Sequence, residues 1–219
     1  MNINIISLFP EVIEPYFKLL PYKKAMGKNA LDINLYPLRN FAIDKHGTVD
    51  DKPYGGGKGM VLRVEPIYSA VEQIKKDHGE QKVILLSPKG ELFNQNKAKE
   101  LSKLENITII CGRYEGVDHR VHKYIADEVI SIGEYILSGG EIPALVLIES
   151  VVRLLPGVLD EEAKTKESFE NDKKEHPQYT RPEKFRGWHA PEILLSGHHK
   201  NIEEWRDNKS PAVEKKPGK

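Results

Sequence analysis

The first 155 residues alternate between strand-like and helix-like segments, and this alternation constrains the fold more than any other feature. Short, apolar, β-branched runs predict strands at residues 2–9, 31–38, 82–87, 106–112 and 127–132. Apolar residues at helical spacing predict helices at residues 65–76, 94–104, 117–125 and 141–155. This order indicates an α/β fold, with a mostly parallel sheet and helices on both faces. We expect the strands within residues 83–87, 107–112 and 128–132 to form its centre.

The character of the chain changes after Pro156-Gly157. Residues 159–175 are dominated by Asp, Glu and Lys, which is typical of a flexible linker. Residues 176–207 regain apolar side chains that can support a small helical unit, and residues 210–219 are rich in Pro and Lys. We therefore expect an α/β domain at residues 1–158, a linker at 159–175 and a small helical domain at 176–219.

Composition and charge exclude several classes of protein. Hydrophobic residues make up 39% of the chain and charged residues 30%, which is typical of a soluble globular protein. No apolar run approaches the roughly 18–20 residues of a membrane span, and we expect no signal peptide. The single cysteine, Cys111, cannot form an internal disulfide, which favours a cytoplasmic protein with a buried thiol. The net charge is zero, but residues 176–219 hold nine Lys or Arg against six Asp or Glu, which hints at a phosphate-facing module.

Polar or glycine-rich loops follow three of the predicted strands, at residues 86–90, 111–116 and 131–141. Ligands of open α/β sheets bind beyond the carboxyl ends of the strands, and glycine lets the backbone approach a ligand closely. We therefore expect one site, suited to an adenine ring or a neutral nucleoside edge. The fingerprints of phosphate loops and dinucleotide sites are absent, which nearly excludes a Rossmann oxidoreductase.

Several motifs in and around these loops resemble a known family. They are I-I-S-L-F-P at residues 5–10, V-D-D-K-P-Y-G-G-G-K-G-M at 49–60, C-G-R-Y-E-G-V-D at 111–118, S-I-G-E-Y-I-L-S-G-G-E-I-P at 131–143, P-Q-Y-T-R-P at 177–182 and L-L-S-G at 194–197. In this order they are similar to the bacterial tRNA (guanine-37-N1)-methyltransferases of the SPOUT class. The resemblance implies a sheet threaded into a deep trefoil knot and a homodimer with its sites at the subunit interface. It also implies tRNA as partner, S-adenosylmethionine as methyl donor and magnesium as an activator.

Matching positions in the motifs imply the site residues. The cofactor site would consist of Leu86, Ser87, Pro88, Gly112, Ile132, Gly133, Glu134, Tyr135, Ile136, Leu137, Gly139, Gly140 and Pro143. The target guanine would meet Tyr114 and Glu115, and further substrate contacts would come from Asp50, His46 and Arg181. Additional candidates for phosphate contacts are Arg39, Lys45, Lys52 and Arg186.

The same resemblance places the catalytic carboxylate at Glu175, where the family usually has Asp, with Asp172 as the alternative. Guanine N1 is a poor nucleophile until its proton is removed, which a carboxylate can do as general base. Arg153 would stabilise the negative charge that develops on O6 of the guanine. The methyl group would then pass directly to N1, without a covalent enzyme intermediate. We assign no protein-bound metal, because no carboxylate cluster marks a site.

Other interpretations stay open on these residues. Glu175 can be a solvated linker charge, and Arg153 can be a cation at the end of a helix. The chain can also act on another RNA position, or bind tRNA or nucleotides without turnover. The family usually continues with Arg-rich helices after the E-E-W-R-like segment at residues 203–206, which this sequence does not contain. We therefore expect a shortened tRNA-binding domain, either because the chain is naturally short or because it is a piece of a longer protein.

Overall fold

The computed structural model describes residues 1–19, 21–159 and 174–212. The chain divides into two compact units, Met1–Leu159 and Asp160–Lys219. Most of the predicted linker, including Asp172, lies outside the described residues. Each unit has its own arrangement of helices and strands.

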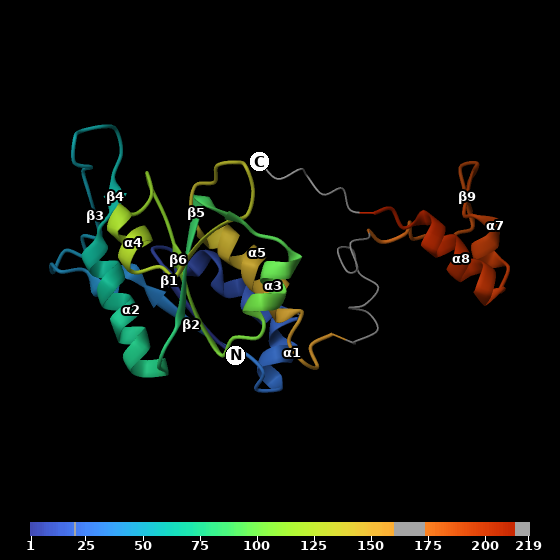
Figure 1. Ribbon diagram of the computed structural model, residues 1–219, viewed down its shortest axis with the longest axis horizontal. Helices are drawn as coiled ribbons and strands as arrows, with labels where there is room; N and C mark the ends of the chain where they lie inside the picture. Colours follow the sequence, from blue (N-terminus) through green and yellow to red (C-terminus); the bar gives the residue numbers. More distant parts are fainter. Residues whose placement is uncertain (20, 160–173, 213–219) are drawn as a thin grey trace. The chain divides into compact units, whose positions relative to one another are not determined.

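The first unit is built on a five-stranded parallel sheet with the order β2-β1-β6-β5-β7 (Figure 1). The strands are β1 (Asn2–Ser7), β2 (Asp32–Pro37), β5 (Lys82–Leu92), β6 (Asn106–Cys111) and β7 (Glu128–Ser131). The predicted α/β fold is confirmed. The predicted centre is wrong in one respect, because β7 forms an edge of the sheet and β1 lies inside it, between β2 and β6. An apolar run indicates that a strand is buried, but it does not say which strands pair with it. The predicted knot stays a prediction.

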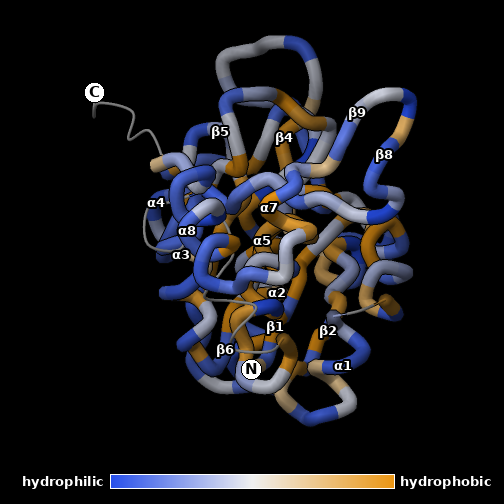
Figure 2. The backbone as a smooth tube through the Cα atoms, turned by 90° about the vertical axis from the view of Figure 1, so that its right-hand side faces the viewer, coloured by the Kyte–Doolittle hydropathy of each residue, from blue (hydrophilic) through white to orange (hydrophobic). Residues whose placement is uncertain are grey.

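Helices cover both faces of the sheet, as the alternation predicts. They are α1 (Tyr22–Gly27), α2 (Val64–His78), α3 (Gln95–Leu101), α4 (His119–Tyr124) and α5 (Glu141–Val152). Successive strand residues point to opposite faces. Ile109 therefore packs in a cluster with residues of α1, α3 and α5, whereas Ile110 packs with residues of α2 and α4. Figure 2 shows the apolar colouring along β1, β6 and α5, where these two clusters meet the sheet.

Local signals set the ends of the helices. The Asn94 side chain accepts a hydrogen bond from the Lys97 amide and caps the start of α3. Gly79, with φ of 79°, ends α2 in a conformation that favours glycine. The four predicted helices are confirmed with ends shifted by up to three residues. In the described part of the chain, no helix combines the length and the apolar character needed to span a bilayer.

The long loop predicted at residues 39–63 contains short elements that the sequence pattern did not predict. The 3-10 helix η3 (Leu38–Phe41) opens it, and β3 (Asp50–Asp51) pairs with β4 (Val61–Leu62) in an antiparallel hairpin. Leu62 donates a backbone hydrogen bond to Gly116 and accepts one from Asp118. These bonds fix the base of the hairpin against the loop that follows β6. Two further 3-10 helices, η1 (Pro10–Val12) and η2 (Glu14–Lys18), follow β1.

The second unit contains a hairpin and two helices in its described part. Strands β8 (Lys184–Phe185) and β9 (Trp188–His189) form the hairpin, and α7 (Glu192–Leu195) and α8 (His199–Lys209) follow it. The Trp205 ring of α8 lies 6.3 Å from the ring of His176 and 6.4 Å from that of Tyr179. The sequence pattern did not predict the hairpin, and the small helical domain at residues 176–219 stays a prediction.

Candidate active site

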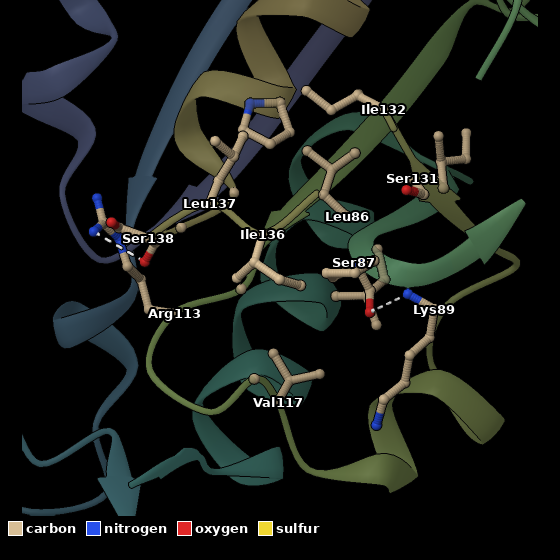
Figure 3. Close-up of a pocket in the computed structure, with 18 of the residues that line it drawn as sticks. Leu86, Ser87, Lys89, Arg113, Val117, Ser131, Ile132, Ile136, Leu137 and Ser138 are labelled. Atoms are coloured by element: carbon tan, nitrogen blue, oxygen red, sulfur yellow. Dashed lines mark hydrogen bonds between the residues drawn. The ribbon is translucent and has the colours of Figure 1, made fainter. Parts of the chain in front are cut away.

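A pocket of about 490 Å³ lies beyond the carboxyl ends of β6 and β7 and beside the middle of β5, where the pairing with β7 shifts register between Leu86 and Glu91. Its walls come from residues 85–89 of β5, from the loops that follow β6 and β7, and from the first turn of α5. This volume is in the usual range for sites that bind small molecules and cofactors. Figure 3 shows Leu86, Ile136 and Leu137 directed toward the centre of the pocket. The three segments that the sequence singled out therefore line one pocket, although the structure places residues 86–90 inside β5 and not in a loop after it.

Of the thirteen residues predicted to bind the cofactor, all except Glu134 line this pocket. Glu134 is an exposed residue of the loop after β7 and is not among the residues that line the pocket. Tyr114 and Glu115, the candidates for contacting guanine, also line the pocket. Their binding roles stay predictions, but the sequence motifs located the pocket.

Other lining residues were not predicted. They are Leu85, Lys89, Arg113, Gly116, Val117, His122, Ile130, Ser131 and Ser138. Most belong to the same three loops and could have been found by taking each loop whole. His122 is different, because it reaches the pocket from α4 and only the packing of that helix places it there.

Close backbone contact holds the loops after β6 and β7 together. The Gly140 amide donates a hydrogen bond of 2.8 Å to the Gly112 carbonyl. A Cβ at Gly140 would lie 2.6 Å from the Cα of Cys111 and 2.8 Å from the Gly112 nitrogen. Both neighbours are backbone atoms, so no side-chain movement can make room. The pocket wall therefore requires glycine at this position.

A buried carboxylate joins three segments behind the pocket. Glu141, which is 1% exposed, accepts hydrogen bonds from Ser7 Oγ at 2.8 Å and from Arg113 Nε at 2.9 Å. Arg113 also donates through a terminal nitrogen to the Ser138 carbonyl at 3.3 Å (Figure 3). Its guanidinium carbon lies 4.8 Å from the centre of the Phe9 ring. The network thus links the end of β1, the loop after β6 and the loop after β7.

Two titratable groups near the pocket have pKa values shifted by their surroundings. Burial raises the pKa of the Cys111 thiol well above its ordinary value, so the thiol stays protonated and is a poor nucleophile. Burial lowers the pKa of His122, and the positive charges of His119 and Lys89 add to this effect. The His119 and His122 rings stack with their centres 5.3 Å apart. His122 therefore presents a neutral imidazole to the pocket at neutral pH.

The glycine-rich loop lies beside the predicted guanine contacts. The Glu115 amide donates a hydrogen bond to the Met60 carbonyl, and the Gly59 Cα packs against the Glu115 side chain. Tyr114 adopts a φ of 60° and leaves 47% of its surface exposed. Asp50 lies in β3 at the base of the same hairpin, whereas His46 lies in the exposed segment before it.

The two predicted catalytic residues, Arg153 and Glu175, belong to different units of the chain. Arg153 follows the last residue of α5, whose first residue is at the pocket, so it lies roughly 18 Å along the helix from Glu141. Glu175 belongs to the second unit, is exposed and accepts a hydrogen bond of 2.7 Å from Gln178 Nε2. Arg181, also predicted to bind the substrate, is an exposed residue of that unit. Among the described residues, no group of three or more His, Cys, Asp or Glu could hold a metal ion.

Comparisons of the sequence and of the structure with known proteins all indicate the same family. Residues 1–216 match the family model described as tRNA (guanine-1)-methyltransferase TrmD. The chain is 53% identical over 207 residues to the tRNA (guanine-N(1)-)-methyltransferase of Dictyoglomus turgidum, which covers 94% of this chain and 83% of that protein. It is 45% identical over 218 residues to the protein of the same name from Clostridioides difficile, with 98% and 94% covered. The crystal structure of the tRNA (m1G37) methyltransferase from Aquifex aeolicus superimposes with a TM-score of 0.81 and 46% identity, covering 95% of this chain and 90% of that one.

Proposed function

The chain belongs to the tRNA (guanine-1)-methyltransferase family, and from this premise we propose that it methylates N1 of guanosine 37 in tRNA with S-adenosylmethionine as donor. The observation that carries the proposal is the pocket beside β5 and beyond β6 and β7, which twelve of the thirteen predicted cofactor residues line. The substrate tRNA supports a cytoplasmic location for the enzyme.

The residues of the pocket fit a nucleoside with an attached thioether chain. Leu86, Ile136 and Leu137 offer an apolar surface for an adenine ring, and the glycines at 112 and 140 expose backbone groups to its polar edge. S-adenosylmethionine supplies a methyl group on a positively charged sulfur when it is bound. The ligand also carries a carboxylate, and the lining includes the cations Lys89 and Arg113.

The chemistry of the chain's own residues is proton removal and alignment. Glu175 takes the proton from guanine N1, and Asp172 is the alternative base. Arg153 stabilises the charge that moves onto O6. Tyr114 and Glu115, at the pocket wall, orient the base. Magnesium acts as an activator in this proposal.

A second copy of the chain completes each site in this proposal. One copy alone leaves Arg153 far from its own pocket along α5. Ile142 and Val146, one turn apart on α5, are 46% and 42% exposed and border the pocket residue Pro143. Apolar side chains on one helical face next to an incomplete site support a homodimer that uses this face.

The decisive experiment measures methyl transfer from labelled S-adenosylmethionine to unmodified tRNA transcripts, with the product base identified by mass spectrometry. We expect 1-methylguanosine at position 37 and no product with a transcript that carries adenosine there. Methylation at any other position, or cofactor binding without turnover on any tRNA, would contradict the proposal.

The base is identified by Glu175→Gln and Asp172→Asn in parallel. Loss of methyl transfer with unchanged cofactor binding in Glu175→Gln assigns proton removal to Glu175. Loss only in Asp172→Asn assigns it to the alternative carboxylate. Full activity in both variants would exclude either residue as the base.

A further inference from the structure

The β8–β9 hairpin of the second unit presents a turn that is costly for its sequence. Arg186 and Gly187 form the two-residue turn with φ of 48° and 88°. Two positive φ values are typical of a type I′ turn, whose first position favours Asn, Asp or Gly. Arginine is strained in this conformation, because its Cβ lies close to the following carbonyl oxygen. The hairpin thus places the Arg186 side chain at its tip in a strained backbone conformation.

Two aromatic rings flank this cation on one face of the hairpin. Phe185 and Trp188 are directly paired across the strands, with ring centres 5.9 Å apart and planes at 54°. They are 53% and 72% exposed, and every residue from 181 to 189 is exposed. The Arg186 guanidinium carbon lies 5.5 Å from the centre of the Phe185 ring. Among the described residues, neither ring belongs to a buried hydrophobic cluster.

The charge of this segment complements a polyanion. Residues 181–189 contain Arg181, Lys184 and Arg186 against the single carboxylate of Glu183. The other described residues of the second unit hold four Lys or Arg against five Asp or Glu, so the cations gather at the hairpin. Exposed aromatic rings among cations are the combination with which proteins bind unpaired nucleotides, because bases stack on the rings and phosphates approach the cations.

We propose that the Phe185–Trp188 pair is a stacking platform for an unpaired base of the tRNA, and that Lys184 and Arg186 contact the adjoining phosphates. This inference rests on the proposed function, since it names the surface of the second unit that meets the same substrate. A two-stranded hairpin alone is only marginally stable in water. In contact with RNA, the exposed rings of Phe185 and Trp188 stack on a base and Arg186 pairs with a phosphate.

Trp188 itself reports on the contact, because the chain has only two tryptophans. In Trp205→Phe, Trp188 is the sole tryptophan, and we expect unmodified tRNA transcript with G37 to quench its fluorescence. In Trp188→Phe the remaining Trp205, which packs against His176 and Tyr179, should change far less. Quenching of Trp188 by dimer formation at rising protein concentration, and not by tRNA, would assign the rings to a protein contact and overturn the proposal.

Binding of the same transcript separates this inference from the proposed function. We expect Trp188→Ala and Phe185→Ala to raise the Kd of the full-length enzyme about 5- to 140-fold, the range expected for loss of one stacked base. Tyr68→Ala removes a similarly exposed ring from α2 and should leave Kd unchanged. If the wild type binds and methylates tRNA and both hairpin variants have an unchanged Kd, the stacking platform is refuted and the proposed function is not. Absence of methylation by the wild type would refute the proposed function, whatever the hairpin variants do.

Arg186→Gly distinguishes a contact from a structural effect. Glycine accepts the positive φ without strain, so the midpoint of thermal unfolding should not fall. Loss of one phosphate contact should weaken tRNA binding and reduce the slope of log Kd against log salt by about one. A lowered melting temperature, or an unchanged salt slope, would overturn the role of Arg186.

Discussion

At the scale of single residues, the substitution of Glu141 should destabilise the packing of several segments behind the pocket. It is a nearly fully buried carboxylate that holds Ser7 and Arg113 in place behind the pocket. Removal of one partner from a buried ion pair typically costs about 3–5 kcal/mol, because the other charge is left uncompensated. We expect Glu141→Ala to lower the free energy of unfolding by about 3 kcal/mol. This is the lower end of the range, because the Arg113 side chain stays partly exposed to water.

Urea denaturation and calorimetric titration with S-adenosylmethionine test this prediction. Ser7→Ala removes the hydrogen bond to the Glu141 carboxylate and the one from the Phe9 amide but leaves the ion pair with Arg113, and it should cost about 2 kcal/mol. Glu80→Gln changes an exposed carboxylate and serves as the control. Equal stability of Glu141→Ala and the control would show that the network is not needed for the pocket.

His122 gives the site a dependence on pH. Its pKa lies below the ordinary value of 6.5, first because of burial and then because of His119 and Lys89. The unfolded chain therefore binds the proton at higher pH than the folded chain does. His122 contributes stability above about pH 6.5, and this is lost as the pH falls through its folded-state pKa.

We expect the melting temperature to fall between about pH 7.5 and pH 5.5 by more in the wild type than in His122→Asn. His198→Asn changes an exposed histidine of the second unit and should behave like the wild type. The idea fails if wild type and His122→Asn lose the same number of degrees over this range.

At the scale of elements, the contact between the loops after β6 and β7 depends on Gly140. A methyl group there meets backbone atoms of Cys111 and Gly112, so the loops must move apart. We expect Gly140→Ala to cost about 1–3 kcal/mol of stability and to weaken S-adenosylmethionine binding by at least tenfold. Gly27→Ala is the matched control, since a Cβ at the end of α1 meets nothing within 4 Å. Cofactor affinity that survives in Gly140→Ala would mean that the loops can separate without harm to the pocket.

Elements differ in how far their sequence predicts them. The strand at residues 106–112 is predicted to within one residue of β6, because β-branched apolar side chains fill it. The interior place of β1 is not predictable in this way, because strand order is decided by pairing between distant segments. The same holds for the site. Motifs identify loop residues such as Gly140, whereas His122 reaches the pocket only through the packing of α4.

At the scale of the whole molecule, the exposed face of α5 should decide the oligomeric state. Val146 is 42% exposed and one turn from Ile142. A charge in the centre of an apolar interface is strongly unfavourable, so we expect Val146→Glu to be monomeric by analytical ultracentrifugation and inactive in methyl transfer. Tyr68→Glu places the same charge on an exposed position of α2 and should leave both properties unchanged. A dimeric Val146→Glu would place the interface elsewhere.

Complementation between two inactive variants tests whether one site draws on two chains. Gly140→Ala damages the pocket and Glu175→Gln damages the base, so each homodimer alone should be impaired. Suppose that each pocket receives its base from the other chain. A mixed dimer then keeps one intact site, which combines the undamaged pocket of the Glu175→Gln chain with Glu175 of the Gly140→Ala chain. Since random exchange makes half of the dimers mixed, the mixture should recover about a quarter of the wild-type activity. If pocket and base belong to the same chain, both sites of the mixed dimer are damaged, and mixing should restore nothing. Recovery therefore argues that the roughly 18 Å between Arg153 and the start of α5 reflects a site divided between two copies.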